Sequence, residues 1–440
     1  MGANKSLFAI TTEWVDDEEV KGEEFRATMA RLRIDVGSVT VTYAQEKDTN
    51  TFTDNLLLPV YPLAEWIATN WWHLGDESPH SNRTSSEFES RHNFSLAGGG
   101  YPLPNLSALP EGENVFLKYR PKENKYWPVS FLRAGEVQVS LSIFREALGD
   151  FLTSVVERLK MKGIQGTLLQ IQWDDINSLT SPERDFCRFA AKLGHYPLTL
   201  DDDQQQSIVE AAALLPDPVV DEFFSGAMLE EGLVEQAMVL NRFFADAGRS
   251  TEPRDRLNGL RGKLRQCSLH GAPWNKGYQA AATVRQMWAL DGKLFVNQDD
   301  IIGFFELPED MFAVDPGETS QVIDGAYCLN KSNSLEFNMY QTSMHSKKFT
   351  FFRILHDYVF DYKSNMGLAT RGYSARQKQN RAFAAEILAP AEYLKKRFKG
   401  KSVVSWGDIE NITNELNISD WVVAHQLKNH NIAEVSQLGL

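Results

Sequence analysis

The chain has little cysteine, no long apolar runs and a deficit of positive charge, and each shortage excludes a class of protein. Three cysteines in 440 residues are too few and too scattered for a disulfide framework or a thiolate metal site. No apolar run approaches the roughly 18 residues that a membrane-spanning helix requires. A formal net charge of −14 argues against sequence-independent binding to nucleic acid. We therefore expect a cytoplasmic protein without a membrane span.

Common catalytic signatures are also missing. The sequence has no Walker-type phosphate loop, no dinucleotide-binding glycine fingerprint at the start of a helix and no serine nucleophile elbow. Its hydrophobic content of 42% and charged content of 24% are those of an ordinary folded protein. The length predicts two or three domains with substantial cores.

Hydrophobic periodicity predicts an α+β fold that begins with a mixed α/β domain over residues 1–175. Leu7–Val15 alternates apolar and polar residues, as a half-buried strand does, whereas Phe144–Met161 has the spacing of an amphipathic helix. Arg91-His92-Asn93 precedes a glycine run, and this tripeptide is either a polar site or a turn.

Two further parts are expected after this domain. Residues 176–271 predict a helical middle region and connector, in which Ser181-Pro182 has the pattern of a helix start. Residues 272–440 predict a second α+β domain with a helical tail. The tail, Trp406–Leu427, has the size of a helix-turn-helix motif, but its second helix is too apolar for a major-groove face.

A helical phrase in the last domain has an unusual set of polar residues. Residues 348–360 are Lys-Phe-Thr-Phe-Phe-Arg-Ile-Leu-His-Asp-Tyr-Val-Phe. The phrase resembles a zinc-peptidase helix of the type R-F-T-L-A-H-E-L-G-H-Y-L, in which two His bind zinc and the Glu polarises a water. In this alignment Arg353 and Asp357 stand at the two His positions, and Ile354 stands at the Glu position.

Residues 379–390, Gln-Asn-Arg-Ala-Phe-Ala-Ala-Glu-Ile-Leu-Ala-Pro, provide a second resemblance. They are similar to the E-A-N-x-F-A-A-E-L-L-M-P helix of the ImmA/IrrE metallopeptidase family, whose leading Glu is the third zinc ligand. Gln379 occupies that place here. Upstream, residues 324–330 resemble the strand that precedes the zinc helix. The chain thus resembles a long-form ImmA/IrrE member with a degenerate zinc site, and the resemblance implies a zincin-like domain over residues 272–440 without a metal or cofactor.

A shift of the alignment by three residues does not restore a zinc site. It makes His356 the first ligand, but Phe360 then stands at the second position. A single His cannot anchor a catalytic zinc, which needs three protein ligands. His356 is therefore expected to be a helix-surface or hydrogen-bonded structural histidine.

The resemblance implies a pseudopeptidase that acts by binding a protein partner. Such a partner would be a toxin, a repressor or a defence-system subunit in bacterial regulation, toxin neutralisation or phage defence. Arg353 and Asp357 lie four residues apart on one helix face, so an intrahelical ion pair between them is expected to occupy the space of the metal.

A basic block offers a candidate surface for that partner. Residues 345–401 hold 13 Lys and Arg against 4 Asp and Glu, a local charge of +9 that leaves −23 on the rest of the chain. Two alternatives stay open: a nucleic-acid-interacting regulator that uses this block, and a metallopeptidase with non-standard ligands. The block could also dock on the chain's own acidic half. The residues expected at the mouth of the former catalytic groove are Lys347, Lys348, Arg376, Lys378 and Arg381.

Overall fold

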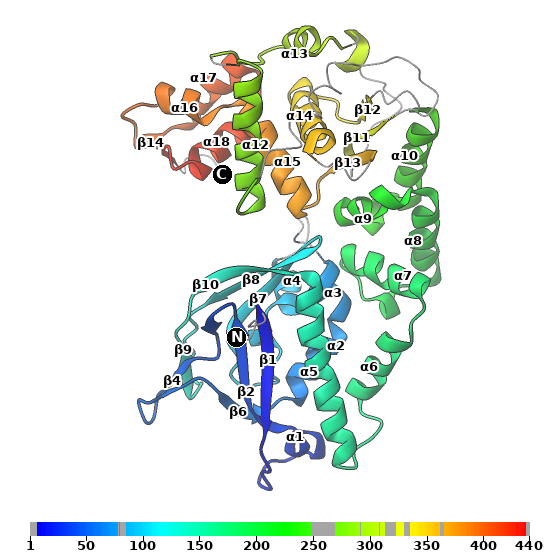
Figure 1. The fold of residues 1–440 in the computed structure, drawn as a ribbon, viewed down its shortest axis with the longest axis vertical. Coiled ribbons are helices and arrows are strands. Elements are labelled where there is room, and N and C mark those ends of the chain that lie inside the picture. The colour runs from blue at the N-terminus through cyan, green and yellow to red at the C-terminus, as the bar shows by residue number, and fades with distance from the viewer. Residues whose placement is uncertain are drawn as a thin grey trace, which may run out of the picture. The chain divides into compact units, whose positions relative to one another are not determined.

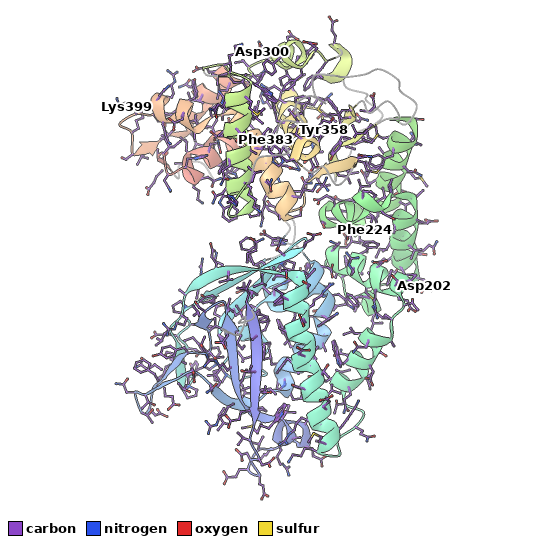
Figure 2. The ribbon with its side chains drawn as sticks, viewed as in Figure 1. Asp202, Phe224, Asp300, Tyr358, Phe383 and Lys399 are labelled. Carbon is purple, nitrogen blue, oxygen red and sulfur yellow. The ribbon has the colours of Figure 1, made fainter. Side chains whose placement is uncertain are left out.

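The computed structural model describes residues 7–77, 79, 85–247, 269–290, 292–307, 309–312, 323–329, 335–360 and 365–436. It combines many helices with small, mostly antiparallel sheets, which confirms the predicted α+β class. The chain divides into two compact units, Met1–Asp201 and Asp202–Leu440. The helical region expected over residues 176–271 is shared between them, because its first helix belongs to the first unit and the helices from Asp202 onward belong to the second (Figures 1 and 2).

Antiparallel sheets and one long helix organise the first unit. Strand β2 lies between β1 and β3 and also pairs with β6, while two three-stranded sheets have the orders β5-β4-β9 and β10-β8-β7. The strands are β1 Phe8–Trp14, β2 Met29–Val36, β3 Val39–Thr40, β4 Ala44–Glu46, β5 Phe52–Thr53, β6 Leu56–Pro59, β7 Asn105–Glu111, β8 Asn114–Arg120, β9 Val129–Phe131 and β10 Gly135–Ser140.

The long helix, α5 (Leu141–Met161), starts where Ser140 accepts a hydrogen bond from the Ile143 amide. Its apolar face packs on β1, and the Phe8 and Phe144 rings lie 5.1 Å apart in the core. The strand expected at Leu7–Val15 and the helix expected at Phe144–Met161 are therefore confirmed. The other helices of this unit are α1 Glu23–Ala27, α2 Tyr61–Thr69, α3 Trp71–Asp76, α4 Ser85–His92, α6 Leu168–Ser178 and α7 Ser181–Lys192, with 3₁₀ turns at Phe94–Leu96 and Pro197–Thr199.

In the second unit, helices surround a three-stranded antiparallel sheet of order β12-β11-β13. The strands are β11 Ile323–Leu329, β12 Leu335–Met339 and β13 Met366–Thr370, and the short β14 Val403–Val404 pairs in parallel with β15 Glu434–Val435. The helices are α8 Asp202–Leu214, α9 Asp217–Gly226, α10 Leu233–Ala247, α12 Pro273–Met287, α13 Gln298–Phe305, α14 Met344–Phe360, α15 Ala375–Leu388, α16 Ala391–Arg397, α17 Trp406–Leu416 and α18 Asp420–Asn429, with 3₁₀ turns at Leu229–Glu231 and Glu309–Phe312.

Helix α14 is buried along almost its whole length, between the sheet and α15. Its Tyr358 ring packs against Tyr327 of β11 with the centroids 6.0 Å apart. Helix α12 lies against the other side of α15, as Figure 1 shows. This contact requires glycine at position 277, because a Cβ there would lie 2.3 Å from the Gln379 carbonyl oxygen.

Candidate functional site

The two phrases that carry the family resemblance form neighbouring helices in the structure. Helix α14 holds Arg353, His356 and Asp357, and α15 follows β13 directly along the chain. Ser374 sets the start of α15 by accepting a hydrogen bond from the Gln377 amide, 3.2 Å away. Helices α14 and α15 pack against each other.

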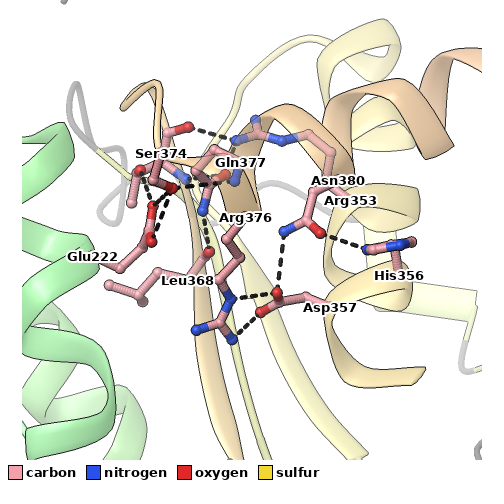
Figure 3. A network of polar contacts seen from close by, with 10 residues as sticks. Glu222, Arg353, His356, Asp357, Leu368, Ser374, Arg376, Gln377 and Asn380 are labelled. Carbon is pink, nitrogen blue, oxygen red and sulfur yellow. Dashed lines mark hydrogen bonds and ion pairs between the residues drawn. The ribbon is translucent and has the colours of Figure 1, made fainter. Parts of the chain in front are cut away.

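Arg353 forms a buried network with groups from three elements (Figure 3). Its guanidinium is 3% exposed and donates to Asp324 of β11, to the Thr370 carbonyl and, at 2.6 Å, to Gln377 Oε1. Gln377 in turn donates to the Leu368 carbonyl, 2.7 Å away. The Arg353 side chain therefore ties α14 to both the sheet and the first turn of α15.

Asp357 forms a second network one helical turn further along. Both of its carboxylate oxygens accept hydrogen bonds from the guanidinium of Arg376, and one also accepts from Asn380 at 3.2 Å. Burial alone would lower the pKa of Arg376, but the charge and hydrogen bonds of Asp357 raise it well above its ordinary value. The pair lies close to Gly367 of β13, where an added Cβ would lie 2.5 Å from Asp357 Oδ2.

His356 lies beside this pair and is neutral. Its Nδ1 lies 2.6 Å from Asn380 Oδ1, which can only accept, so Nδ1 carries the proton and Nε2 accepts from Gln379 at 3.3 Å. Burial lowers the pKa of His356 to about 4. The ring also stacks on Phe360, with the centroids 4.8 Å apart. Of the two alternatives expected for His356, the hydrogen-bonded structural histidine is correct and the helix-surface histidine is wrong.

The ion pair expected at this site is replaced by other contacts. Arg353 and Asp357 do not form the predicted intrahelical ion pair, because their partners are Asp324 and Arg376. The Gln379 amide nitrogen lies 3.3 Å from His356 Nε2. Ile354 is 1% exposed and belongs to the apolar core.

The residues that the alignment places at the motif positions do not fit a zinc site. Arg353 is a cation, Ile354 at the Glu position has no donor atom, and the Asp357 carboxylate already accepts hydrogen bonds from two side chains. Among the described residues, no three His, Cys, Asp or Glu side chains come together in a way that could hold a metal ion. The same residues include no helix long and apolar enough to cross a membrane.

Glu222 is a member of the site that sequence reasoning missed. It lies on α9 and accepts hydrogen bonds from Ser374 Oγ at 3.0 Å and Thr370 Oγ1 at 3.4 Å (Figure 3). It precedes these partners by about 150 residues, so no local pattern in the chain could have identified it. The sequence indicated Asp324 only as the first residue of an expected strand. Its role as the partner of Arg353 could not be predicted, because the sheet brings the two residues together.

The predicted basic surface is largely absent, because two of its five members are buried. Lys347 and Lys348 are 1% and 0% exposed. The Lys347 ammonium donates to the Phe312 carbonyl at 2.8 Å, and Lys348 donates to the Val296 carbonyl at 2.6 Å. Burial lowers the pKa of Lys348 to about 8. Arg376 forms an ion pair with Asp357. Lys378 and Arg381 are the remaining, partly exposed members of the predicted basic surface.

A groove of about 720 Å³ lies beside these networks in the second unit. On α15 it is lined by a single face of the helix, which runs from Lys378 to Leu388 and therefore extends about 15 Å. The lining residues of this face are Lys378, Arg381, Ala382, Ala385 and Leu388. Faces of α12, α14 and α18 and residues of the connecting segments form the rest of the walls.

The expected helix-turn-helix tail forms as α17 and α18, and its second helix packs against the domain. Gln426 of α18 donates to Glu386 at 2.7 Å and to the Ala389 carbonyl at 3.0 Å. Val423 and Leu427 are buried in the same core. The face of α18 that holds Val422, His425 and Asn429 lines the groove, so this helix acts as a groove wall.

The first unit contains a separate buried charge cluster. Glu77 accepts hydrogen bonds from Arg91 at 2.6 and 2.7 Å and is 3.2 Å from His92 Nε2. Burial alone would raise the pKa of Glu77, but the hydrogen bonds from His92 and Arg91 outweigh it and lower that pKa far below its ordinary value. Arg91 and His92 therefore belong to the last turn of helix α4 and to a buried network, whereas Asn93 caps the 3₁₀ turn Phe94–Leu96 by accepting from the Ser95 amide.

Comparisons with known proteins provide no relative. No family model, no curated protein and no solved structure matches the chain.

Proposed function

We propose that this chain is a non-catalytic protein of the ImmA/IrrE type that acts by binding a partner protein. The resemblance suggests a cytoplasmic role in bacterial regulation, toxin neutralisation or phage defence, with a toxin, a repressor or a defence-system subunit as the partner. The observation that carries the proposal is the internal pairing of Arg353 and Asp357 with Asp324 and Arg376. These pairs hold the two positions at which a catalytic relative would bind zinc.

The chemistry of the pairs supports a scaffold role over a hydrolytic one. A zinc peptidase needs three ligands and an open coordination position for water. Here the polar groups at the corresponding positions already have protein partners, and the site offers His356 as a neutral, buried ring. A network satisfied in this way is rigid, which suits a binding surface.

The decisive experiment measures zinc and peptidase activity on the same purified chain. We expect zinc far below one equivalent after incubation with excess zinc and dialysis, and no cleavage of a mixed peptide library. A stoichiometric zinc ion that disappears in H356A or D357A would overturn the proposal. Exposed His270 supplies the matched control, because H270A changes a histidine away from the site.

A further inference from the structure

Two guanidinium groups converge at one end of the groove. Arg353 and Arg381 both donate to the carbonyl oxygen of Thr370, so their charges lie close together. Arg381 donates also to the Gly372 carbonyl and stacks on the Tyr373 ring at 5.0 Å. Among the described residues no carboxylate lies within ion-pair distance of Arg381. Burial, and then the charge of Arg353, lower the pKa of Arg381 to about 10.

The rim of the same end adds more positive charge. Arg371 is exposed and makes no hydrogen bond or ion pair with any described residue. Lys378 lines the groove beside it. The single carboxylate of the lining, Asp324, already accepts from Arg353 and Gln341. This end of the groove therefore carries a surplus of cations, in a chain whose formal net charge is −14.

The remainder of the lining is suited to a flat ring. Trp274 and Trp421 line the groove and remain 39% and 56% exposed. The amide side chains of Gln341 and Asn429 line it as well. Exposed tryptophan rings provide faces on which the base of a ligand can stack.

We infer that the groove binds a nucleoside phosphate, with its phosphate at the arginine end and its base against the aromatic and amide side chains. Arginine groups pair with phosphate oxygens through charge-assisted hydrogen bonds, and tryptophan rings stack on bases. The inference rests on the groove alone and holds whether or not the family resemblance is correct. Because the chain has no glycine-rich phosphate loop, side chains would provide the recognition.

An extended acidic peptide matches the groove less well. Such peptides are usually held by a ladder of backbone hydrogen bonds along an exposed strand. Here most of the lining comes from faces of α12, α14, α15 and α18, whose backbone groups are bonded largely within their own helices. The groove therefore offers mainly side chains, which recognise charge and rings.

Isothermal titration of the full chain with AMP, ADP, adenosine and pyrophosphate tests the inference, together with the matching guanine, cytosine and uracil compounds. We expect at least one nucleoside phosphate to bind with a Kd below about 100 µM. The nucleoside alone and pyrophosphate alone should bind at least about ten-fold more weakly, because each retains only one of the two sets of contacts.

Variants of exposed residues locate the binding without disturbing the fold. R371A removes a cation with no described partner, and W421A removes an exposed ring. Each should weaken nucleotide binding by about ten-fold or more at an unchanged melting temperature. The matched control K399A removes an exposed cation outside the groove and should leave the affinity unchanged.

Four results would overturn the inference. The first is that no nucleoside phosphate binds, and the second is that pyrophosphate binds as tightly as the nucleotide. The third is an unchanged nucleotide affinity in both R371A and W421A. The fourth is tighter binding of a polyglutamate peptide or a single-stranded oligonucleotide than of the mononucleotides. None of them bears on the zinc measurement, so the two proposals fail separately.

Discussion

Asp357 of α14 and Arg376 of α15 form a two-point ion pair in which the aspartate side chain is 2% exposed and the arginine side chain 23% exposed. The pair joins the two helices that carry the motif resemblance. A buried ion pair of this kind adds little net stability relative to apolar residues, but it is strongly destabilising when only one partner is removed.

A double-mutant cycle on this pair should therefore be far from additive. R376M leaves Asp357 unpaired in the interior and should cost about 3 kcal/mol of unfolding free energy. The double variant D357L/R376M should be more stable than R376M alone, because no buried charge remains. Urea denaturation of the wild type, D357L, R376M and the double variant measures the coupling. Additive losses would show that the two side chains do not depend on each other.

His356 should make the fold sensitive to acid. Its pKa in the folded state is lowered from 6.5 to about 4, so protonation favours the unfolded chain. The stabilisation from the neutral ring is present above pH 6.5 and disappears as the pH falls toward 4, with a magnitude on the order of 3 kcal/mol.

The variant H356Q keeps an N–H donor for Asn380 and does not titrate. Its melting temperature should fall less steeply than that of the wild type between pH 6.5 and 4. The exposed control H270Q should keep the wild-type slope. Identical slopes for wild type and H356Q would contradict the assigned environment of the ring.

Charge reversal should separate buried from exposed members of the basic block. K348E places a carboxylate among the carbonyl oxygens of Val296 and Leu416 and should cost more than about 3 kcal/mol. R371E changes an exposed side chain and should alter stability by less than about 1 kcal/mol. Thermal unfolding compares them. A small loss of stability in K348E would show that the Lys348 ammonium group of the wild type lies in solvent.

Gly277 and Gly303 should respond oppositely to alanine. At position 277 a Cβ would meet the Gln379 backbone, so G277A should separate α12 from α15 and destabilise the unit by about 1–3 kcal/mol. At position 303 of α13 an added Cβ would lie within 4 Å of no described residue beyond its own helix turn and chain neighbours, so G303A should stabilise that helix by up to about 1 kcal/mol. Denaturation midpoints give both values, and a stabilising G277A would refute the close helix contact.

The sequence anticipated elements whose pattern is local. The spacing of Phe144–Met161 indicated a helix, because hydrophobic periodicity reports which face of an element is buried. The resemblance of the two motif phrases to peptidase helices implied neighbouring helices in the C-terminal part. The local sequence pattern could not show that Lys347 and Lys348 donate to buried carbonyl oxygens, since these acceptors lie on segments distant in the chain. Local composition made those lysines look like surface charge.

By itself, the sequence determined the α+β class and the identity of the side chains at the motif positions, because these depend on periodicity and residue type. Only the tertiary structure decided how those side chains pair. Arg353 is closer along the helix to Asp357 than to any other acid, yet it bonds to Asp324, because the sheet brings that carboxylate to its buried guanidinium. A buried charge takes the partner that the fold places beside it, since leaving it unpaired costs more than any local ion pair on a helix surface returns.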